Sequence, residues 1–208
     1  HSFEVLHAAG LRSIGITWSR ANAFGTGVPF RFPADPDIGL GLTDMGKELV
    51  RLCDARGVMI DLSHLNAAGF RDVAAISTKP LVATHSNVHA ICPSSRNLVD
   101  WQLAAIRESR GVVGLNYATG FLRPDGRFES NTSLDLMVRH VEALVEAVGQ
   151  DGVALGSDFD GAMIPAEIGD VTGVRKLLQA LLDKGFGERL VRKIGIDNWL
   201  SLIERTIG

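Results

Sequence analysis

Five short apolar runs, each followed by a stretch long enough for a helix, constrain the fold of this chain more than any other feature. Strands that are buried on both faces read as continuous apolar runs, and helices between them are typical of parallel β/α units. The expected strands are Ser13–Thr17, Val58–Leu62, Leu81–Thr84, Val112–Asn116 and Val153–Gly156. The expected helices are Thr43–Arg56, Ala67–Ser77, Asp100–Arg110 and Leu134–Val148, with two or three more after the last strand. The sequence therefore predicts an α/β fold with a parallel sheet.

Length and composition limit the size and the partners of this fold. The chain has 208 residues, which suffice for one domain over residues 1–208 but fall short of a complete eight-unit barrel of about 250 residues. The net charge of −3 and the scattered basic residues argue against nucleic acid as a partner. No apolar run is long enough to cross a membrane, and the start does not resemble a signal peptide, so we expect a cytoplasmic protein.

Two long segments and three glycines mark where connections are expected. Ser19–Leu42 and Ala118–Thr132 exceed ordinary loop lengths and are rich in Gly, Pro and Asp, so we expect them to cover a site at the carboxyl ends of the strands. Gly57, Gly111 and Gly185 each follow a basic residue and are expected at the C′ position just past the end of a helix, which is usually left-handed.

The residues at the ends of the apolar runs carry the chemistry, because parallel barrels build their active sites there. They are Trp18, Ser63–His64, His85–Ser86, Asn116–Tyr117 and Ser157–Asp158. One histidine after a strand is more often a packed residue than a ligand, but two imidazoles and a carboxylate on three strand ends together indicate a metal site. The two cysteines form no CxxC pair. Histidine and carboxylate ligands suit Zn²⁺, with Mn²⁺ or Co²⁺ as substitutes.

Three neighbouring residues have two readings each. Asp160 is expected either to cap the next helix or to orient a neighbouring ligand. Asp61 either points away from the barrel axis or orients His64, with a structural role favoured. Arg96, eleven positions after His85, either binds a substrate carboxylate or oxyanion, or lies on the surface paired with Asp100.

Several motifs together resemble one family. DLSH at 61–64, THSN at 84–87, SSRN at 94–97, GSDFDG at 156–161 and the run from Gly41 to His64 are similar to the membrane (renal) dipeptidase family of zinc peptidases and its bacterial members. The resemblance covers nearly the whole chain and includes the spacing of 21 positions between the two histidines. It implies a (β/α)8 TIM barrel with two zinc ions that hydrolyses dipeptides through a metal-bound hydroxide.

The resemblance also implies residue roles. His64 and His85 would bind one zinc ion, and Asp158 would bind the other and transfer a proton. Arg96 and Asn97 match the position that contacts substrate. Trp18 stands where several members have a substrate-contacting histidine, and it can instead form an apolar wall.

The sequence departs from the family in its first part. It has no HxD pair, and the Glu that bridges the metals would fall before His1. We therefore expect strands four to eight of the barrel without strands one to three, an incomplete site in this chain alone, and poor solubility unless the rest is supplied. Two alternatives to this function stay open. One is another hydrolase on the same barrel, which opens β-lactam, amide or lactone bonds, and the other is a non-catalytic barrel fragment. A homodimer also stays open.

Overall fold

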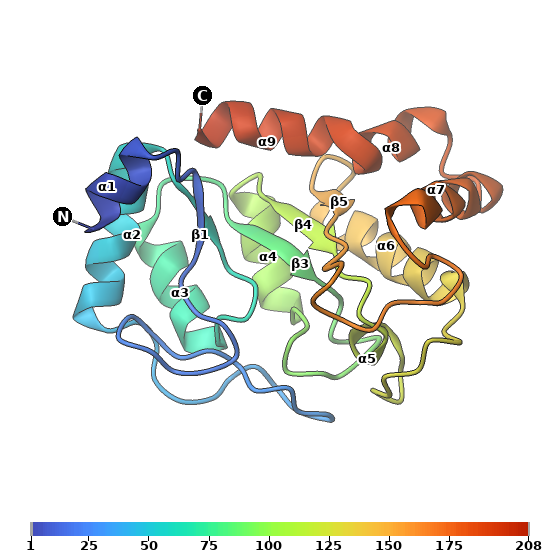
Figure 1. The fold of residues 1–208 in the computed structure, drawn as a ribbon, viewed down its shortest axis with the longest axis horizontal. Coiled ribbons are helices and arrows are strands. Elements are labelled where there is room, and N and C mark those ends of the chain that lie inside the picture. Colours follow the sequence, from blue (N-terminus) through green and yellow to red (C-terminus); the bar gives the residue numbers. More distant parts are fainter. Residues whose placement is uncertain (1, 208) are drawn as a thin grey trace.

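The computed structural model describes residues 2–207 and contains a parallel sheet of five strands that pair in chain order (Figure 1). The strands are β1 Ser13–Gly15, β2 Met59–Asp61, β3 Val82–Ser86, β4 Val112–Leu115 and β5 Val153–Leu155. The helices before β5 are α1 Ser2–Ala8, α2 Asp44–Arg56, α3 Ala67–Ile76, α4 Asp100–Glu108, α5 Thr119–Leu122 and α6 Leu134–Val148. After β5 come η1 Val171–Gly173, α7 Val174–Asp183, α8 Glu188–Arg192, η2 Lys193–Asp197 and α9 Asn198–Thr206. The predicted α/β class is confirmed, and the sheet is part of a barrel.

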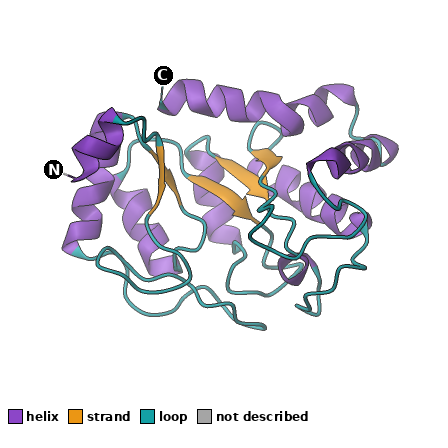
Figure 2. Cartoon of the chain, in the orientation of Figure 1, coloured by secondary structure: helices purple, strands orange, loops and turns teal. Residues whose placement is uncertain are grey.

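Helices α2, α3, α4 and α6 cover one face of the sheet, and the long loops gather at one end of it (Figure 2). The helices bury their apolar sides against strand residues such as Ile60, Ala83 and Val113, which belong to the main core. Helix α6 has the bounds that its apolar stripe predicts, because a period of 3.6 residues over four turns is a strong signal. No helix among residues 2–207 is long and apolar enough to cross a membrane.

The connection from α4 to β4 differs from the prediction at Gly111. The residue in the left-handed conformation is Arg110, with φ of 56°, and Gly111 is not among the residues with positive φ. Gly111 is required for another reason, since a Cβ atom there would lie 1.8 Å from the carbonyl oxygen of Leu81. The prediction holds for Gly57 and Gly185, which have φ of 61° and 96°.

Strand β3 runs further than its apolar residues predict. It continues to Ser86, so His85 lies within the strand and the prediction that it follows the strand is wrong. The pairing of β3 with β4 shifts register between Ala83 and Ser86. Irregularities of this kind bend a strand locally and re-aim its side chains, and they are frequent beside functional sites. The shift therefore falls where the chain presents His85.

Candidate functional site

The carboxyl ends of the strands enclose a cavity of about 500 Å³. The two long loops reach this end, because the amide of Val28 donates to the carbonyl of His64 and the amide of Thr119 donates to the carbonyl of Met163. Its polar floor comes from β2, from β3 and from the segments that follow β1, β2 and β5. The floor residues are Thr17, Asp61, Ser63, His64, His85 and Asp158. The structure thus brings the predicted histidines and Asp158 to one cavity.

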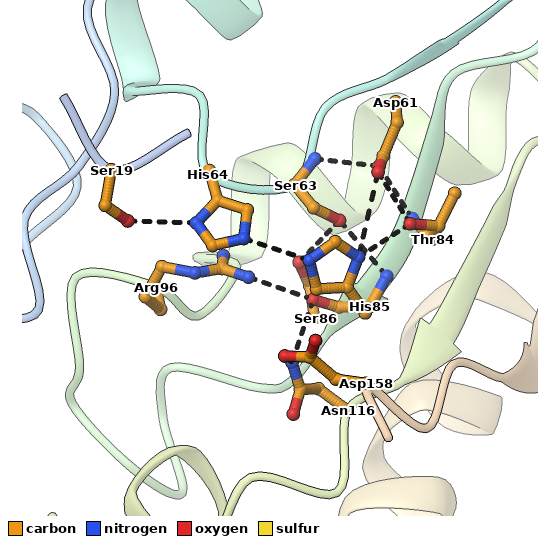
Figure 3. A network of polar contacts seen from close by, with 10 residues as sticks. All are labelled: Ser19, Asp61, Ser63, His64, Thr84, His85, Ser86, Arg96, Asn116 and Asp158. Carbon is orange, nitrogen blue, oxygen red and sulfur yellow. Dashed lines mark hydrogen bonds and ion pairs between the residues drawn. The ribbon is translucent and has the colours of Figure 1, made fainter. Parts of the chain in front are cut away.

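His64 and His85 point their imidazoles at one another (Figure 3). Their Nε2 atoms lie 3.0 Å apart. Two nitrogens that share one zinc ion at about 2.0–2.1 Å are separated by roughly 3 Å as well. The pair therefore has the spacing of two ligands of one ion.

The outer nitrogen of each imidazole is held by a hydroxyl. The hydroxyl of Thr84 lies 2.6 Å from Asp61 Oδ2 and must donate to that carboxylate, so it accepts from His85 Nδ1 at 2.7 Å. His85 then carries its proton on Nδ1 and leaves a lone pair on Nε2. Ser19 Oγ lies 2.9 Å from His64 Nδ1 and can donate or accept there. It can therefore satisfy His64 in either tautomer.

The surroundings keep both imidazoles neutral. Burial, the positive charge of Arg96 and the neighbouring His85 together lower the pKa of His64 to about 2. Burial also lowers the pKa of His85, against the opposing effect of the carboxylate of Asp61. Neutral imidazole is the form that binds metal ions, so no proton has to be displaced at neutral pH.

Asp61 has a role that differs from both sequence readings. It lines the cavity and accepts from the amides of Ser63 and Thr84 at 3.0 and 2.9 Å. Its Oδ2 lies 3.7 Å from Nδ1 of His85. Asp61 therefore does not point away from the axis, and the imidazole that it helps to orient is that of His85 rather than His64.

Asp158 lines the floor of the cavity, where Asn116 holds it. The Nδ2 atom of Asn116 donates to Asp158 Oδ2 at 3.1 Å and to the carbonyl of His85 at 3.4 Å. Among residues 2–207, no three His, Cys, Asp or Glu side chains form a cluster that could hold a metal ion. The described residues thus offer an imidazole pair and a separate carboxylate.

Strained backbone accompanies these residues. His64, Asp158 and Asp160 have φ of 70°, 57° and 65°. Residues with side chains rarely adopt this left-handed region, and where they do the strain often serves a site. Asp160 is exposed, and the helix that follows is capped by Asp170, whose side chain accepts from Thr172. The capping role expected for Asp160 is therefore wrong.

Arg96 is buried, with 3% of its surface exposed. Its Nη2 donates to the carbonyl of His85 at 3.2 Å, its guanidinium lies 5.4 Å from the ring centre of Phe121, and its Nε atom has no partner. Burial lowers the pKa of Arg96 to about 10, which leaves the side chain charged at neutral pH. The reading of Arg96 as a surface residue paired with Asp100 is therefore wrong.

Asn97 and Trp18 lie in different settings. Asn97 is buried, and its Nδ2 donates to the carbonyls of Cys92 and Phe121 at 2.8 and 2.9 Å, so in this conformation it fastens the loop rather than facing the cavity. Trp18 lines the cavity with 53% of its surface exposed, and its ring centre lies 6.2 Å from that of His64.

Sequence reasoning missed three partners of the site: Ser19, Thr84 and Asn116. Thr84 directly precedes His85, and a hydroxyl beside a candidate ligand is a signal that could have been used. Asn116 stands at a strand end, but its residue type alone does not indicate a role. Ser19 lies in a long loop, where nothing in the sequence relates it to a histidine 45 positions away.

Comparison with known proteins gives this arrangement a family. The family model described as "Membrane dipeptidase (Peptidase family M19)" matches residues 2–206. Over 201 residues, the chain is 49% identical to an uncharacterized protein in the pqqA 5′ region of Klebsiella pneumoniae, covering 97% of this chain and 74% of that protein.

Two solved structures share the fold throughout. One is the dipeptidase AC, a metallo peptidase of family M19, which is 54% identical with a TM-score of 0.98 over 100% of this chain. The other is a metallo peptidase from Rhodobacter sphaeroides liganded with a phosphinate mimic of the dipeptide L-Ala-D-Ala, also 54% identical, with a TM-score of 0.97 over 99% of this chain. This chain spans 61% and 58% of the lengths of those two structures. It belongs to the membrane dipeptidase family, Peptidase family M19.

Proposed function

We propose that the full-length protein that contains this chain is a metal-dependent dipeptidase, and that this chain supplies one part of its active site. The observation that carries the proposal is the pair of neutral imidazoles, 3.0 Å apart at Nε2, at the floor of a cavity in a chain of this family. The relative from Rhodobacter sphaeroides carries a phosphinate mimic of a dipeptide, which supports dipeptides as the substrate class.

The donor set fits zinc. His64 and His85 are the proposed ligands of one ion, and Asp158 is the proposed ligand of a second, with Mn²⁺ or Co²⁺ able to substitute. Bound ions would supply the Lewis acidity that activates water and polarises the peptide carbonyl. The hydroxyls of Ser19 and Thr84 would fix the imidazoles so that both Nε2 lone pairs face the same point.

The remaining residues act on the substrate and the proton. Asp158, fixed by Asn116, would accept a proton from the attacking water and pass it to the leaving amine. Arg96 would help to position the dipeptide and place a positive charge behind the imidazoles, where negative charge develops on the carbonyl oxygen. Asn97 would hold the loop that carries Arg96, and Trp18 would form an apolar wall.

The test uses the full-length protein with its metal content measured. We expect turnover of at least one dipeptide in a panel of L,L- and L,D-dipeptides, loss of turnover after chelation, and recovery on addition of Zn²⁺, Mn²⁺ or Co²⁺. A β-lactam in the same panel separates this activity from that of a ring-opening amide hydrolase. Metal-loaded protein that turns over no dipeptide would overturn the proposal.

A further inference from the structure

The cavity has an apolar wall beside its polar floor. This wall, here named the aromatic wall, consists of Trp18, Phe30, Phe121, Phe128, Ala162 and Met163. Trp18 and Phe128 remain 53% and 48% exposed, although they line a concave site. Ligand cavities of 300–1,000 Å³ commonly combine such apolar linings with a few fixed polar groups, and this one has about 500 Å³.

The four rings of the wall form a continuous ladder. The ring centres of Trp18 and Phe30 are 5.6 Å apart, those of Phe30 and Phe121 5.5 Å, and those of Phe121 and Phe128 5.7 Å, each pair in an edge-to-face arrangement. These distances are favourable for aromatic pairs, so each ring is held by its neighbours. Gly120 permits this packing, because a Cβ atom there would lie 2.5 Å from the ring of Phe128. The wall is therefore preorganised for an apolar group.

The two ends of the wall lie beside different parts of the floor. Trp18 and Phe30 flank His64, with ring centres 6.2 and 6.1 Å from its imidazole. Met163 lies in the segment that continues from Asp158. Its carbonyl accepts a hydrogen bond from the amide of Thr119, which belongs to the same short helix, α5, as Phe121. The part of the wall formed by Phe121, Phe128 and Met163 is therefore joined to the segment that carries Asp158, whereas Trp18 and Phe30 lie beside His64.

We propose that this part of the aromatic wall selects dipeptides with a large apolar side chain on the C-terminal residue. The inference rests on the proposed dipeptidase function, in which Asp158 delivers a proton to the leaving amine. That amine belongs to the C-terminal residue, so the side chain of this residue lies next to Asp158 and within reach of Phe121, Phe128 and Met163.

The experiment compares Ala-Ala, Ala-Phe and Phe-Ala as substrates of the full-length protein, each with the configuration that the dipeptide panel favours. We expect the highest kcat/KM for Ala-Phe. Phe128→Ala should lower kcat/KM for Ala-Phe by about tenfold or more and change that for Ala-Ala by less than about threefold, because only the large side chain loses its contact. Phe128→Leu, which keeps an apolar group, should give an intermediate loss for Ala-Phe.

Phe32→Ala is the matched control. Phe32 is another partly exposed loop phenylalanine, at 39%, but it packs on Gly126 and does not line the cavity. This variant should leave the ratio of kcat/KM for Ala-Phe to that for Ala-Ala unchanged.

Two results would overturn this inference and leave the dipeptidase proposal standing. They are an equal loss for Ala-Ala and Ala-Phe in Phe128→Ala, and a higher kcat/KM for Phe-Ala than for Ala-Phe. Failure to turn over any dipeptide would instead remove the proposed function and this inference together.

Discussion

The two ends of the five-stranded sheet are built differently. At the starts of the strands, α9 lies across the sheet (Figure 1), and Leu202 packs in a small core with apolar residues of four strands. Asn198 donates to the carbonyls of Gln150 and Val153 at 2.8 and 2.7 Å. Trp199 extends this contact along the short strand β5, because its indole donates to the carbonyl of Leu155, the last residue of β5, at 2.9 Å. The polar side chains named here are buried or partly buried with their hydrogen bonds made.

The carboxyl ends of the strands show the opposite features. Three residues with side chains adopt positive φ in the segments that follow β2 and β5. Within residues 2–207, the buried side-chain atoms that lack a partner belong to Thr17, Arg96, Asn97, Tyr117 and Thr119, all from segments at this end. Unmade hydrogen bonds and strained backbone lower stability. The difference teaches that contacts at the starts of the strands stabilise this chain, whereas residues at the carboxyl ends, where the site lies, lower its stability.

The largest expected effect is on activity, at the carboxyl end. His85→Ala should lower kcat/KM of the full-length protein by about 10³-fold or more, because it removes one of the two proposed imidazole ligands. The thermal midpoint of the metal-free protein should change little, since the imidazole lies beside the cavity and its burial is partial.

His89→Ala is the control for this substitution. His89 lies near the same loops, but its Nε2 faces the carbonyl of Ala34 at 3.0 Å and it does not line the cavity. Steady-state kinetics and metal analysis should separate the two variants. Equal activity of His85→Ala and His89→Ala would refute the proposed role of His85 and, with it, the functional difference between the two ends of the sheet.

The next effect is on stability, at the opposite end. Leu202 is fully buried, so Leu202→Ala should lower the free energy of unfolding by about 2–5 kcal/mol through lost burial and a residual cavity. Activity per folded molecule should stay within about twofold. Denaturant unfolding and kinetics on the same preparation check both parts. A variant that kept its stability but lost activity would contradict the division between the two ends.

A smaller effect is expected at the hydroxyl that orients His85. Thr84→Val keeps the shape of the side chain but removes the acceptor for His85 Nδ1 and the donor to Asp61. Metal affinity should fall by about 10- to 100-fold, which is the usual cost of losing such a partner. Thr78→Val is the matched control, because the hydroxyl of Thr78 donates to Asp54 on the exposed surface of the molecule. Competition with a chelator measures the affinity, and equal affinity in both variants would refute the role of Thr84.

The same two ends differ in how far the sequence predicts them. Strands, helices and the bounds of α6 follow from apolar periodicity, which reports burial. His64, His85 and Asp158 follow from their place after apolar runs, which the parallel fold makes meaningful. Their presence at one cavity could be expected, whereas their assignment to metal ions stays a prediction.

What the sequence does not predict depends on contacts between distant segments. The extension of β3 through His85 arises from a register shift against β4, and polar residues at the end of a run give no sign of it. The ladder of Trp18, Phe30, Phe121 and Phe128 joins segments about a hundred positions apart, and no local period relates them. The left-handed Arg110 reverses a rule that favours glycine, because Gly111 is needed where the backbone approaches Leu81.

The smallest expected effect compares backbone strain at the two ends of the sheet. Arg110 precedes the start of β4 and Asp160 follows the end of β5, and both are exposed residues with positive φ, of 56° and 65°. Glycine adopts this conformation without steric cost, so Arg110→Gly should raise the free energy of unfolding by about 0.5–1 kcal/mol after the added freedom of the unfolded chain is subtracted. Asp160→Gly should raise the free energy of unfolding by less, because Asp adopts the left-handed region at a lower cost than Arg does.

Activity distinguishes the two variants. Arg110→Gly should leave kcat/KM unchanged, since the contact from Arg205 reaches the backbone carbonyl of residue 110, which glycine keeps. Asp160→Gly should lower kcat/KM a few-fold, because it loosens the segment that holds Asp158 in its own left-handed conformation. If Asp160→Gly gained stability without any loss of activity, strain in that segment would have no part in the site, and the contrast between the two ends would then rest on His64 and Asp158.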